Sequence, residues 1–243
     1  MDAGAHEPPS SLIDDALLGP VRAVNAFEET VGRLLQQIRL GIVEPGASLP
    51  PERELATRFA VSRDTVREAI RALTEAGYVH ARRGRYGGTF VASQLPAPTA
   101  LDGTVDVAEL DDVFGVRDVL EPGAARLAAA RALSAAERAA LTTHARESAA
   151  ASADDYRRLD SRLHLAIAEL SGVPSLVTLV AENRMRVNAL LDAIPQLTRN
   201  IEHSDEQHRA VVDAILAGDP AAAEEAMREH LAGSAVLLRG FLG

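Results

Sequence analysis

Three helical patterns occupy the first third of the chain. The first spans Val21–Leu40, where apolar residues recur at the spacing of one helix face. Two shorter patterns follow, Glu52–Phe59 and Ser62–Ala76, separated only by Ala60-Val61. Serine often caps a helix N-terminus, so Ser62 is expected to start the second short helix. These patterns predict two helices joined by a tight turn and packed through their apolar stripes.

A change of pattern after Gly77 predicts a small β-hairpin. Tyr78–Ala81 and Thr89–Val91 have strand-like composition, and they enclose the basic, glycine-rich stretch Arg82–Gly88. Short apolar runs separated by turn residues are typical of hairpins. Two helices at a sharp angle followed by such a hairpin predict a winged helix-turn-helix over residues 20–92.

From residue 106 onward, apolar positions recur only at helical spacing. Six helices are expected, at Val107–Ala132, Ser134–Ala151, Asp154–Ser171, Ser175–Ile194, Gln196–Ala217 and Pro220–Phe241. Their short connections favour antiparallel packing. The expected fold is therefore mainly α, with an N-terminal winged helix-turn-helix and a C-terminal all-α bundle over residues 106–243. A flexible leader is expected at residues 1–19 and a linker at residues 93–105.

Charge and composition narrow the class of protein. The chain of 243 residues has a net charge of −10, yet Pro51–Ala92 contains eight Arg against five acidic residues. A basic patch on an acidic protein indicates a nucleic-acid partner. The chain has no cysteine, no apolar run near the ~20 residues of a membrane span, and no signal-like N-terminus. We expect a cytoplasmic protein without membrane association.

Candidate DNA contacts gather in the first turns of the second short helix. A recognition helix enters the major groove with its N-terminus first, and arginine can form two hydrogen bonds with guanine. The candidates are Ser62, Arg63, Thr65 and Arg67 in the helix, and Arg83, Gly84 and Arg85 in the wing. The alternative is an ordinary solvated helix face. Asp64 should repel phosphate, and it could instead orient an arginine or accept a hydrogen bond from cytosine.

These residues resemble the N-terminal DNA-binding domain of the GntR family of bacterial transcription regulators. The matching positions are Gly41-x-x-x-Pro45-Gly46-x-x-Leu49-Pro50, Glu52-Arg53-x-Leu55-Ala56, Val61-Ser62-Arg63-x-Thr65-Val66-Arg67-Glu68-Ala69 and Gly88-Thr89-Phe90-Val91. The resemblance covers roughly residues 22–92. It implies operator contacts by Arg53, Arg63, Thr65 and Arg67, with Gly84 near the minor groove.

Four ionisable residues lie on the apolar stripes of the predicted bundle helices. Asp160 and His164 are four residues apart and share a helix face. His208 and His230 lie on the stripes of the last two helices, ten residues before Gly218 and ten residues after Pro220. Both histidines therefore sit ~15 Å from the same connection. Each histidine alone could be an ordinary core or surface residue, but together the four can converge on a metal.

An Asp and three His form a mixed oxygen and nitrogen ligand set that suits Zn²⁺, Ni²⁺, Fe²⁺ or Mn²⁺. One such divalent transition metal per chain is therefore expected. Arg117 also lies on an apolar stripe. It could bind a small carboxylate bidentately beside the metal, or it could form a structural ion pair with Glu121.

The C-terminal half resembles the FCD ligand-binding domain of the FadR subfamily within GntR. The matching positions are Arg117-x-x-x-Glu121, Ala124-x-x-Leu127-Ala128-Ala129, Asp160-x-x-x-His164, His208-Arg209-x-Val211, Gly218-Asp219, Ala222 and Met227-x-x-His230-Leu231. The resemblance covers about residues 106–240. It implies Asp160, His164, His208 and His230 as metal ligands and Arg117 as an effector contact. Asn183 and Arg186 are further candidates to line the effector pocket.

The sequence thus predicts a homodimeric, ligand-responsive transcription regulator. It would act as a repressor that a small carboxylate metabolite releases from a palindromic double-stranded DNA operator. One alternative is a metal-dependent hydrolase or lyase that uses the Asp/His site, although the chain has no His-Glu-x-x-His helix. Another is a DNA-binding scaffold without an effector.

Overall fold

The computed structural model describes residues 25–39, 42–84, 87–96 and 107–242, and it divides into two compact units, Met1–Leu95 and Pro96–Gly243. The predicted leader at residues 1–19 and most of the predicted linker lie outside the described residues. Each unit is described below by itself.

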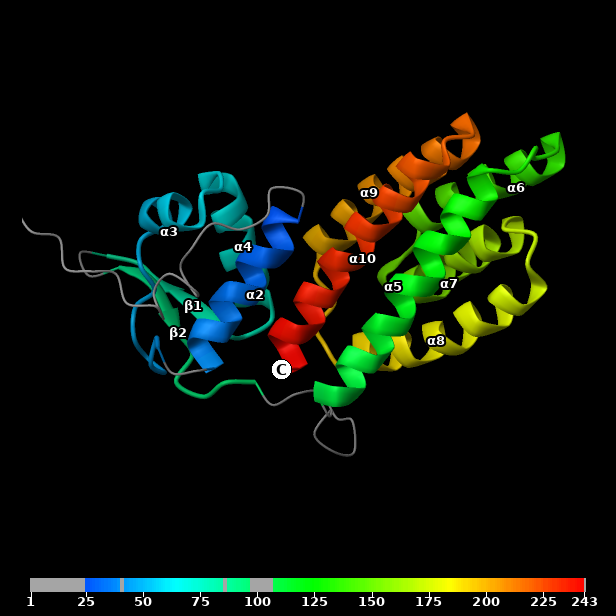
Figure 1. Cartoon of the computed structure of the whole chain (residues 1–243). Coiled ribbons are helices and arrows are strands. Elements are labelled where there is room, and N and C mark those ends of the chain that lie inside the picture. The colour runs from blue at the N-terminus through cyan, green and yellow to red at the C-terminus, as the bar shows by residue number, and fades with distance from the viewer. Residues whose placement is uncertain (1–24, 40–41, 85–86, 97–106, 243) are drawn as a thin grey trace, which may run out of the picture. The chain divides into compact units, whose positions relative to one another are not determined.

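Among its described residues, the first unit contains three helices and a two-stranded sheet (Figure 1). Its helices are α2 (Ala26–Arg39), α3 (Glu52–Phe59) and α4 (Arg63–Glu75), and its strands are β1 (Val79–Arg82) and β2 (Gly88–Val91). Helix α4 packs against α2, α3 and β1, so it lies at the centre of the unit. The fully buried residues include Leu34, Leu35, Leu55, Phe59 and Leu73. The predicted winged helix-turn-helix is confirmed.

The turn between α3 and α4 is tight because of two local features. Ala60 ends α3 with φ 55°, and the Val61 amide then donates to the Ala56 carbonyl at 3.1 Å. Ser62 starts α4, and its hydroxyl accepts a hydrogen bond from the Thr65 amide at 3.0 Å. The chain therefore changes direction over very few residues. One residue in the left-handed conformation ends the first helix, and a serine caps the start of the next.

The second unit is entirely helical among its described residues. Its helices are α5 (Val107–Ala129), α6 (Ala135–Ala149), α7 (Ala153–Leu170), α8 (Pro174–Asp192), α9 (Thr198–Ala217) and α10 (Pro220–Leu242). Helix α5 contacts α7, α8, α9 and α10, whereas α6 packs against α7 and α9 (Figure 1). Ser134 opens α6 with a capping box, in which Glu137 bonds back to the Ser134 amide. All six predicted bundle helices are present, and their bounds differ from the prediction by at most three residues.

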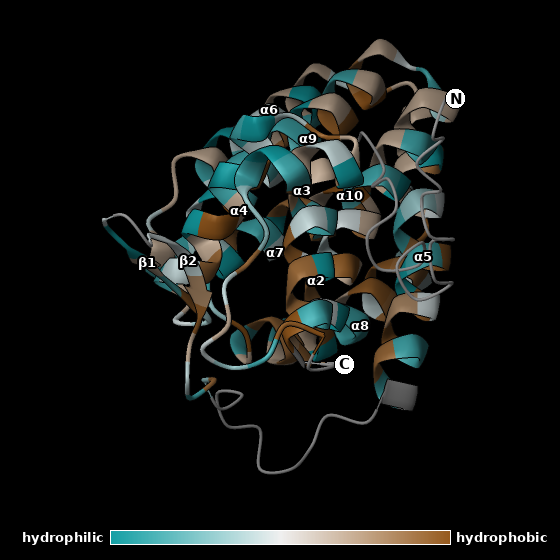
Figure 2. Ribbon diagram, turned by 90° about the vertical axis from the view of Figure 1, so that its left-hand side faces the viewer, coloured by the Kyte–Doolittle hydropathy of each residue, from teal (hydrophilic) through white to brown (hydrophobic). Residues whose placement is uncertain are grey.

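Apolar and polar residues are mixed along the helices of both units, as the colouring of the ribbons in Figure 2 shows. In the bundle, the apolar faces of α5, α7, α9 and α10 meet in one core that includes Ala128, Leu163, Ile167, Ile215 and Met227. No helix in the described ranges is both long and apolar enough to cross a membrane.

Candidate functional site

The leading end of α4 is open to solvent. The side chains of Ser62, Arg63, Asp64 and Arg67 are all exposed, and Thr65 is half-buried. Behind them, Val66 is fully buried and Ile70 largely so, because the opposite face of α4 packs into the core. The apolar stripe therefore fixes the orientation of the helix and turns its polar first turns outward.

Arg67 is held by acidic neighbours. Its Nη1 lies 2.7 Å from Asp64 Oδ1, and its Nε lies 3.6 Å from Glu52 Oε2. Asp64 is therefore an orienting partner for Arg67, one of the two roles that the sequence left open. Arg53, Arg63 and Arg83 are also exposed, and none of them has an ion pair within the described ranges. An arginine without an internal anion is free to bind a phosphate or a base.

The hairpin tip depends on glycine. Gly84 has φ +108°, a conformation that L side chains rarely adopt. A Cβ at Gly87 would lie 2.6 Å from the Arg82 carbonyl oxygen, and the Gly87 amide donates to the Gly84 carbonyl at 2.9 Å. The backbone therefore turns without projecting side chains at these two positions. Arg85, another predicted wing contact, lies outside the described residues.

The four predicted metal ligands come together in the bundle. Asp160 and His164 come from α7, His208 from α9 and His230 from α10, and one ligand atom of each lies within 4.8 Å of every other. The Nε2 atom of His208 is 3.2 Å from Nε2 of His164 and 3.2 Å from Nε2 of His230. Asp160 Oδ1 is 3.3 Å from His208 Nε2 and 3.6 Å from His164 Nε2. All four side chains are buried.

This donor set fits a divalent transition metal. Donor atoms that surround one ion at ~2.1 Å lie roughly 3–4 Å apart, and the four separations given above, from 3.2 to 3.6 Å, fall in this range. The outer ring nitrogens of two of the histidines are held as well: His164 Nδ1 contacts Glu121 Oε2, and His230 Nδ1 lies 3.4 Å from Gln207 Oε1. Such outer contacts direct the Nε2 lone pairs of these rings toward the cluster. The cluster could therefore hold a metal.

Burial and charge set the protonation states around the cluster. Burial lowers the pKa of His208, and burial together with His208 and His164 lowers the pKa of His230 well below its usual value. Both rings are therefore neutral, the form that binds a metal. Burial alone would raise the pKa of Asp160, but Arg184 and His164 hold it well below its usual range. The carboxylate is therefore ionised.

Two carboxylates connect the cluster to buried arginines. Glu121 accepts a hydrogen bond from Arg117 Nε at 2.8 Å while its other oxygen contacts His164. Asp160 Oδ2 contacts Arg184 Nη2, while its Oδ1 faces the imidazoles. The alternative interpretation, in which Arg117 forms a structural ion pair with Glu121, is thus correct for the Nε atom of Arg117. Its Nη1 is directed elsewhere and donates to Ser234 Oγ at 2.8 Å.

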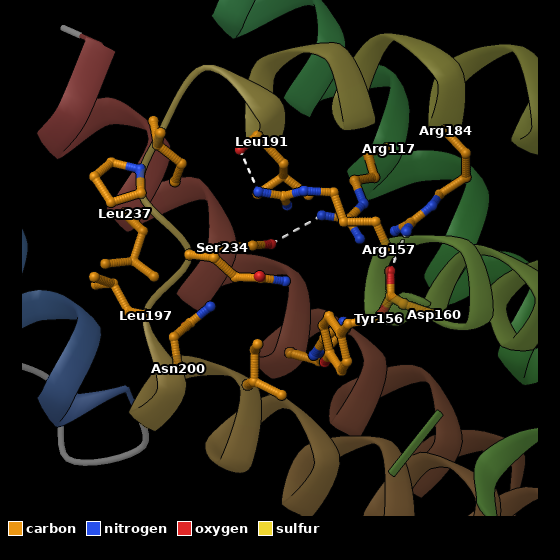
Figure 3. A pocket seen from close by; sticks show the side chains of 15 residues that line it. Arg117, Tyr156, Arg157, Asp160, Arg184, Leu191, Leu197, Asn200, Ser234 and Leu237 are labelled. Carbon is orange, nitrogen blue, oxygen red and sulfur yellow. Dashed lines mark hydrogen bonds and ion pairs between the residues drawn. The ribbon is translucent and has the colours of Figure 1, made fainter. Parts of the chain in front are cut away.

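A small cavity of about 50 Å³ lies beside the cluster. Arg117, Asp160 and His230 line it on one side, and the α8–α9 connection forms another wall. In Figure 3 the side chains of Arg117, Arg157 and Ser234 extend toward the same space, which Asn200 and Leu197 approach from the opposite side. A ligand in this cavity could reach both the metal cluster and Arg117.

The predicted pocket residues on α8 lie elsewhere. Arg186 is at the surface, where its Nη1 pairs with Asp112 Oδ2 at 2.8 Å. Asn183 is buried, but its Nδ2 donates to the Val113 carbonyl at 3.0 Å, and it does not line the cavity. The arginine of α8 that does line it is Arg184, which the sequence analysis missed. Helical spacing could have identified Arg184, because it follows Val180 by four residues and precedes Val187 by three. All three residues lie on the buried face of α8.

Comparison with known proteins identifies both units. The family model described as "Bacterial regulatory proteins, gntR family" matches residues 27–91. The model described as "FCD domain" matches residues 112–233. The first range contains the exposed end of α4 and the hairpin, and the second contains all four residues of the Asp/His cluster.

Several curated relatives match most of the chain. NanR of Salmonella schwarzengrund, an HTH-type transcriptional repressor, is 31% identical over 95% of this chain and 90% of its own length. A provisionally assigned L-lactate dehydrogenase operon regulatory protein of Escherichia coli is 31% identical over 87% of this chain and 84% of its own. RmpR of Mycobacterium gastri, provisionally an HTH-type transcriptional regulator, is 30% identical over 86% and 78%.

Proposed function

Since this chain belongs to the GntR family of bacterial transcription regulators, in the FadR subfamily that carries an FCD domain, we propose that it is a homodimeric repressor controlled by a small carboxylate. Two copies would bind an inverted-repeat operator in the cytoplasm, because a protein with two-fold symmetry reads a DNA site with two-fold symmetry. Binding of the carboxylate in the bundle would release the operator.

The observation that carries this proposal is the exposed, arginine-bearing start of α4. Arg63 and Arg67 lie in its first turns, where side chains reach base edges in the major groove. Arg53 and Arg83 are exposed on α3 and after β1, and they would neutralise phosphates. Gly84 would allow the wing backbone to approach the minor groove, and Arg85 would add positive charge there.

The Asp/His cluster supports the second half of the proposal. Asp160, His164, His208 and His230 would hold one divalent transition metal per chain, with Zn²⁺, Ni²⁺, Fe²⁺ and Mn²⁺ all compatible with these ligands. When bound, the metal supplies a positive centre that attracts a carboxylate oxygen. Arg117 lines the cavity and pairs with Glu121 through Nε, so it would bind the same carboxylate through its Nη atoms.

Release requires that the carboxylate bind one arrangement of the protein more tightly than the other. We infer that ligand contacts with α5, α7 and α10 change how the two DNA-binding units of the dimer are spaced. The matched families and the relatives named above are transcription regulators, so the chain is a regulator rather than a hydrolase or lyase.

Operator selection from a random duplex library tests the DNA half of the proposal. The selected sites should contain an inverted repeat, and their affinity, followed by fluorescence anisotropy, should fall steeply as salt rises because phosphate contacts release counterions. Affinity that does not depend on salt would contradict the proposed contacts. Elemental analysis and mass spectrometry of small molecules released from the same protein test the metal and the effector.

A further inference from the structure

The charged side chains that line the cavity are mostly cationic. Arg117 comes from α5, Arg157 from α7 and Arg184 from α8, whereas the acidic lining residue is Asp160. Arg184 forms a buried ion pair with Asp160. Arg117 donates hydrogen bonds to Glu121 through Nε and to Ser234 through Nη1. Arg157 is the third cation, and its setting differs from that of the other two.

Arg157 lies at the rim of the cavity rather than deep inside it. Its side chain is 23% exposed, and its Nε lies 2.7 Å from Asp192 Oδ1 at the end of α8. Its Nη2 donates to the Leu191 carbonyl. Figure 3 shows the Arg157 side chain extending across the cavity to Leu191. The partner Asp192 is 67% exposed, so water solvates this carboxylate well and the ion pair contributes little to stability.

The charges around the cavity do not balance once a divalent metal is counted. Glu121 pairs with Arg117, and Asp160 pairs with Arg184. A divalent cation in the cluster would therefore add positive charge to a buried region whose other charges are already paired. A dicarboxylate would compensate this charge more fully than a monocarboxylate. Burial also lowers the pKa of Arg157, which reflects a desolvation cost that a nearby anion would offset.

We propose that the effector is a short dicarboxylate and that Arg157 is the specificity-determining residue that binds its second carboxylate. The first carboxylate would lie at the metal cluster and Arg117, as in the proposed function on which this inference rests. The second would replace the exposed Asp192 carboxylate as the partner of Arg157. Gln196 and Asn200, which also line the cavity, could donate further hydrogen bonds to it.

The size of the cavity limits the length of the acid. Its volume of about 50 Å³ is smaller than the roughly 150 Å³ that accommodates benzene in a protein core. Only a short acid can therefore enter, and the rim must yield when it does. Arg157 is a partly exposed part of that rim, and its partner Asp192 lies outside the cavity lining. Exchange of Asp192 for a ligand carboxylate would keep Arg157 paired while the rim opens.

Calorimetric titration of the full-length, zinc-loaded protein tests this inference with matched acids. Malonate is compared with propionate and succinate with butyrate, because each pair differs by replacement of a methyl group with a carboxylate. A charged hydrogen-bonded contact contributes about 1.5–3 kcal/mol. We therefore expect the better dicarboxylate to bind about 10- to 100-fold more tightly than its monocarboxylate partner.

Two variants assign this preference to Arg157. Arg157→Met should remove the preference, because it should weaken dicarboxylate binding much more than monocarboxylate binding. Asp192→Asn, at an exposed position, should tighten dicarboxylate binding selectively because the competing carboxylate is gone. Arg158→Met is the matched control, since Arg158 is the neighbouring residue, is 60% exposed, pairs with Asp155 and does not line the cavity. Arg158→Met should retain the full preference for the dicarboxylate over its monocarboxylate partner.

The outcomes separate this inference from the proposed function. Equal binding of mono- and dicarboxylates by the wild type would overturn the inference and leave the carboxylate effector in place. A preference that survives in Arg157→Met, or an Asp192→Asn variant that changes both acids equally, would also overturn it. If neither class of acid binds the zinc-loaded protein, the proposed carboxylate effector fails and this inference fails with it. Circular dichroism of each variant verifies that it is folded.

Discussion

Glu121 contacts Nδ1 of His164 with one carboxylate oxygen and accepts a hydrogen bond from Arg117 with the other. The candidate metal ligand and the candidate effector contact therefore share one buried carboxylate. Burial alone would raise the pKa of Glu121, but Arg117 and His164 together hold it well below its usual range. A change at Glu121 should consequently affect metal binding and the position of Arg117 together.

Glu121→Gln should weaken zinc binding about 10- to 100-fold, which is the usual effect of removing the outer partner of a metal-binding histidine. It should also lower the free energy of unfolding by about 3 kcal/mol, because Arg117 remains buried without its anion. Zinc competition with a chromophoric chelator and urea unfolding measure the two effects. Glu109→Gln, at an exposed position in the first turn of α5, is the control. Unchanged zinc affinity in Glu121→Gln would rule out an orienting role for this carboxylate.

His208→Ala should reduce the zinc content of the purified protein and lower its melting temperature in the presence of zinc. His208 Nε2 is within 3.3 Å of His164, His230 and Asp160 atoms, so its removal takes away the central donor. His144→Ala is a suitable control, because His144 lies on α6, pairs with Glu147 and is not part of the cluster. If His208→Ala retains the same zinc stoichiometry as the control, His208 is not a ligand.

The metal-free protein should lose stability as the pH falls below about 6.5. The pKa values of His208 and His230 are lowered by burial in the folded state, so the unfolded chain binds protons that the folded chain does not. The contribution of these groups is complete above the unfolded value of 6.5 and decreases toward their folded values. Each proton taken up by the unfolded chain lowers stability by up to about 1.4 kcal/mol per pH unit.

Urea unfolding of the chelator-treated protein at pH 7.0 and at pH 5.5 measures this loss. The carboxylates of Asp160 and Glu121 also have lowered pKa values, but their contribution is lost only in the more acidic range below their unfolded values of 3.8 and 4.5. His208→Gln should therefore show a smaller decrease between these two pH values than the wild type. Equal stability of the wild type at both values would contradict the burial of neutral histidines.

Arg63→Ala should cost about 1–3 kcal/mol of specific operator binding and relax the base preference at one position. Arg63 is exposed at the first turn of α4 and has no acidic partner among the described residues. Arg71→Ala is a matched control on the same helix, since Arg71 lies further along α4 and pairs with Glu68 and Glu75. Anisotropy with the selected operator and with a scrambled duplex gives both affinities. Equal losses of operator affinity in the two variants would contradict a specific role for Arg63 in base recognition.

Local patterns in the sequence determined the helices and the residues that face inward on each. Helical periodicity and capping serines depend on neighbouring residues only, so Ser62 could be identified as a cap without the fold. The same periodicity placed Asp160, His164, His208 and His230 on buried stripes. The equal distances of His208 and His230 from one connection were enough to predict that they meet, because helical rise is constant.

Only the tertiary structure decided which inward side chains pair across helices. Arg184 and Arg186 lie on one helix, yet Arg184 meets Asp160 in the cavity while Arg186 pairs with Asp112 at the surface. Likewise, the contact of Glu121 with His164 joins α5 to α7. Periodicity fixes the direction of a side chain relative to its own helix axis, but the neighbour it meets depends on how the helices pack and rotate against one another.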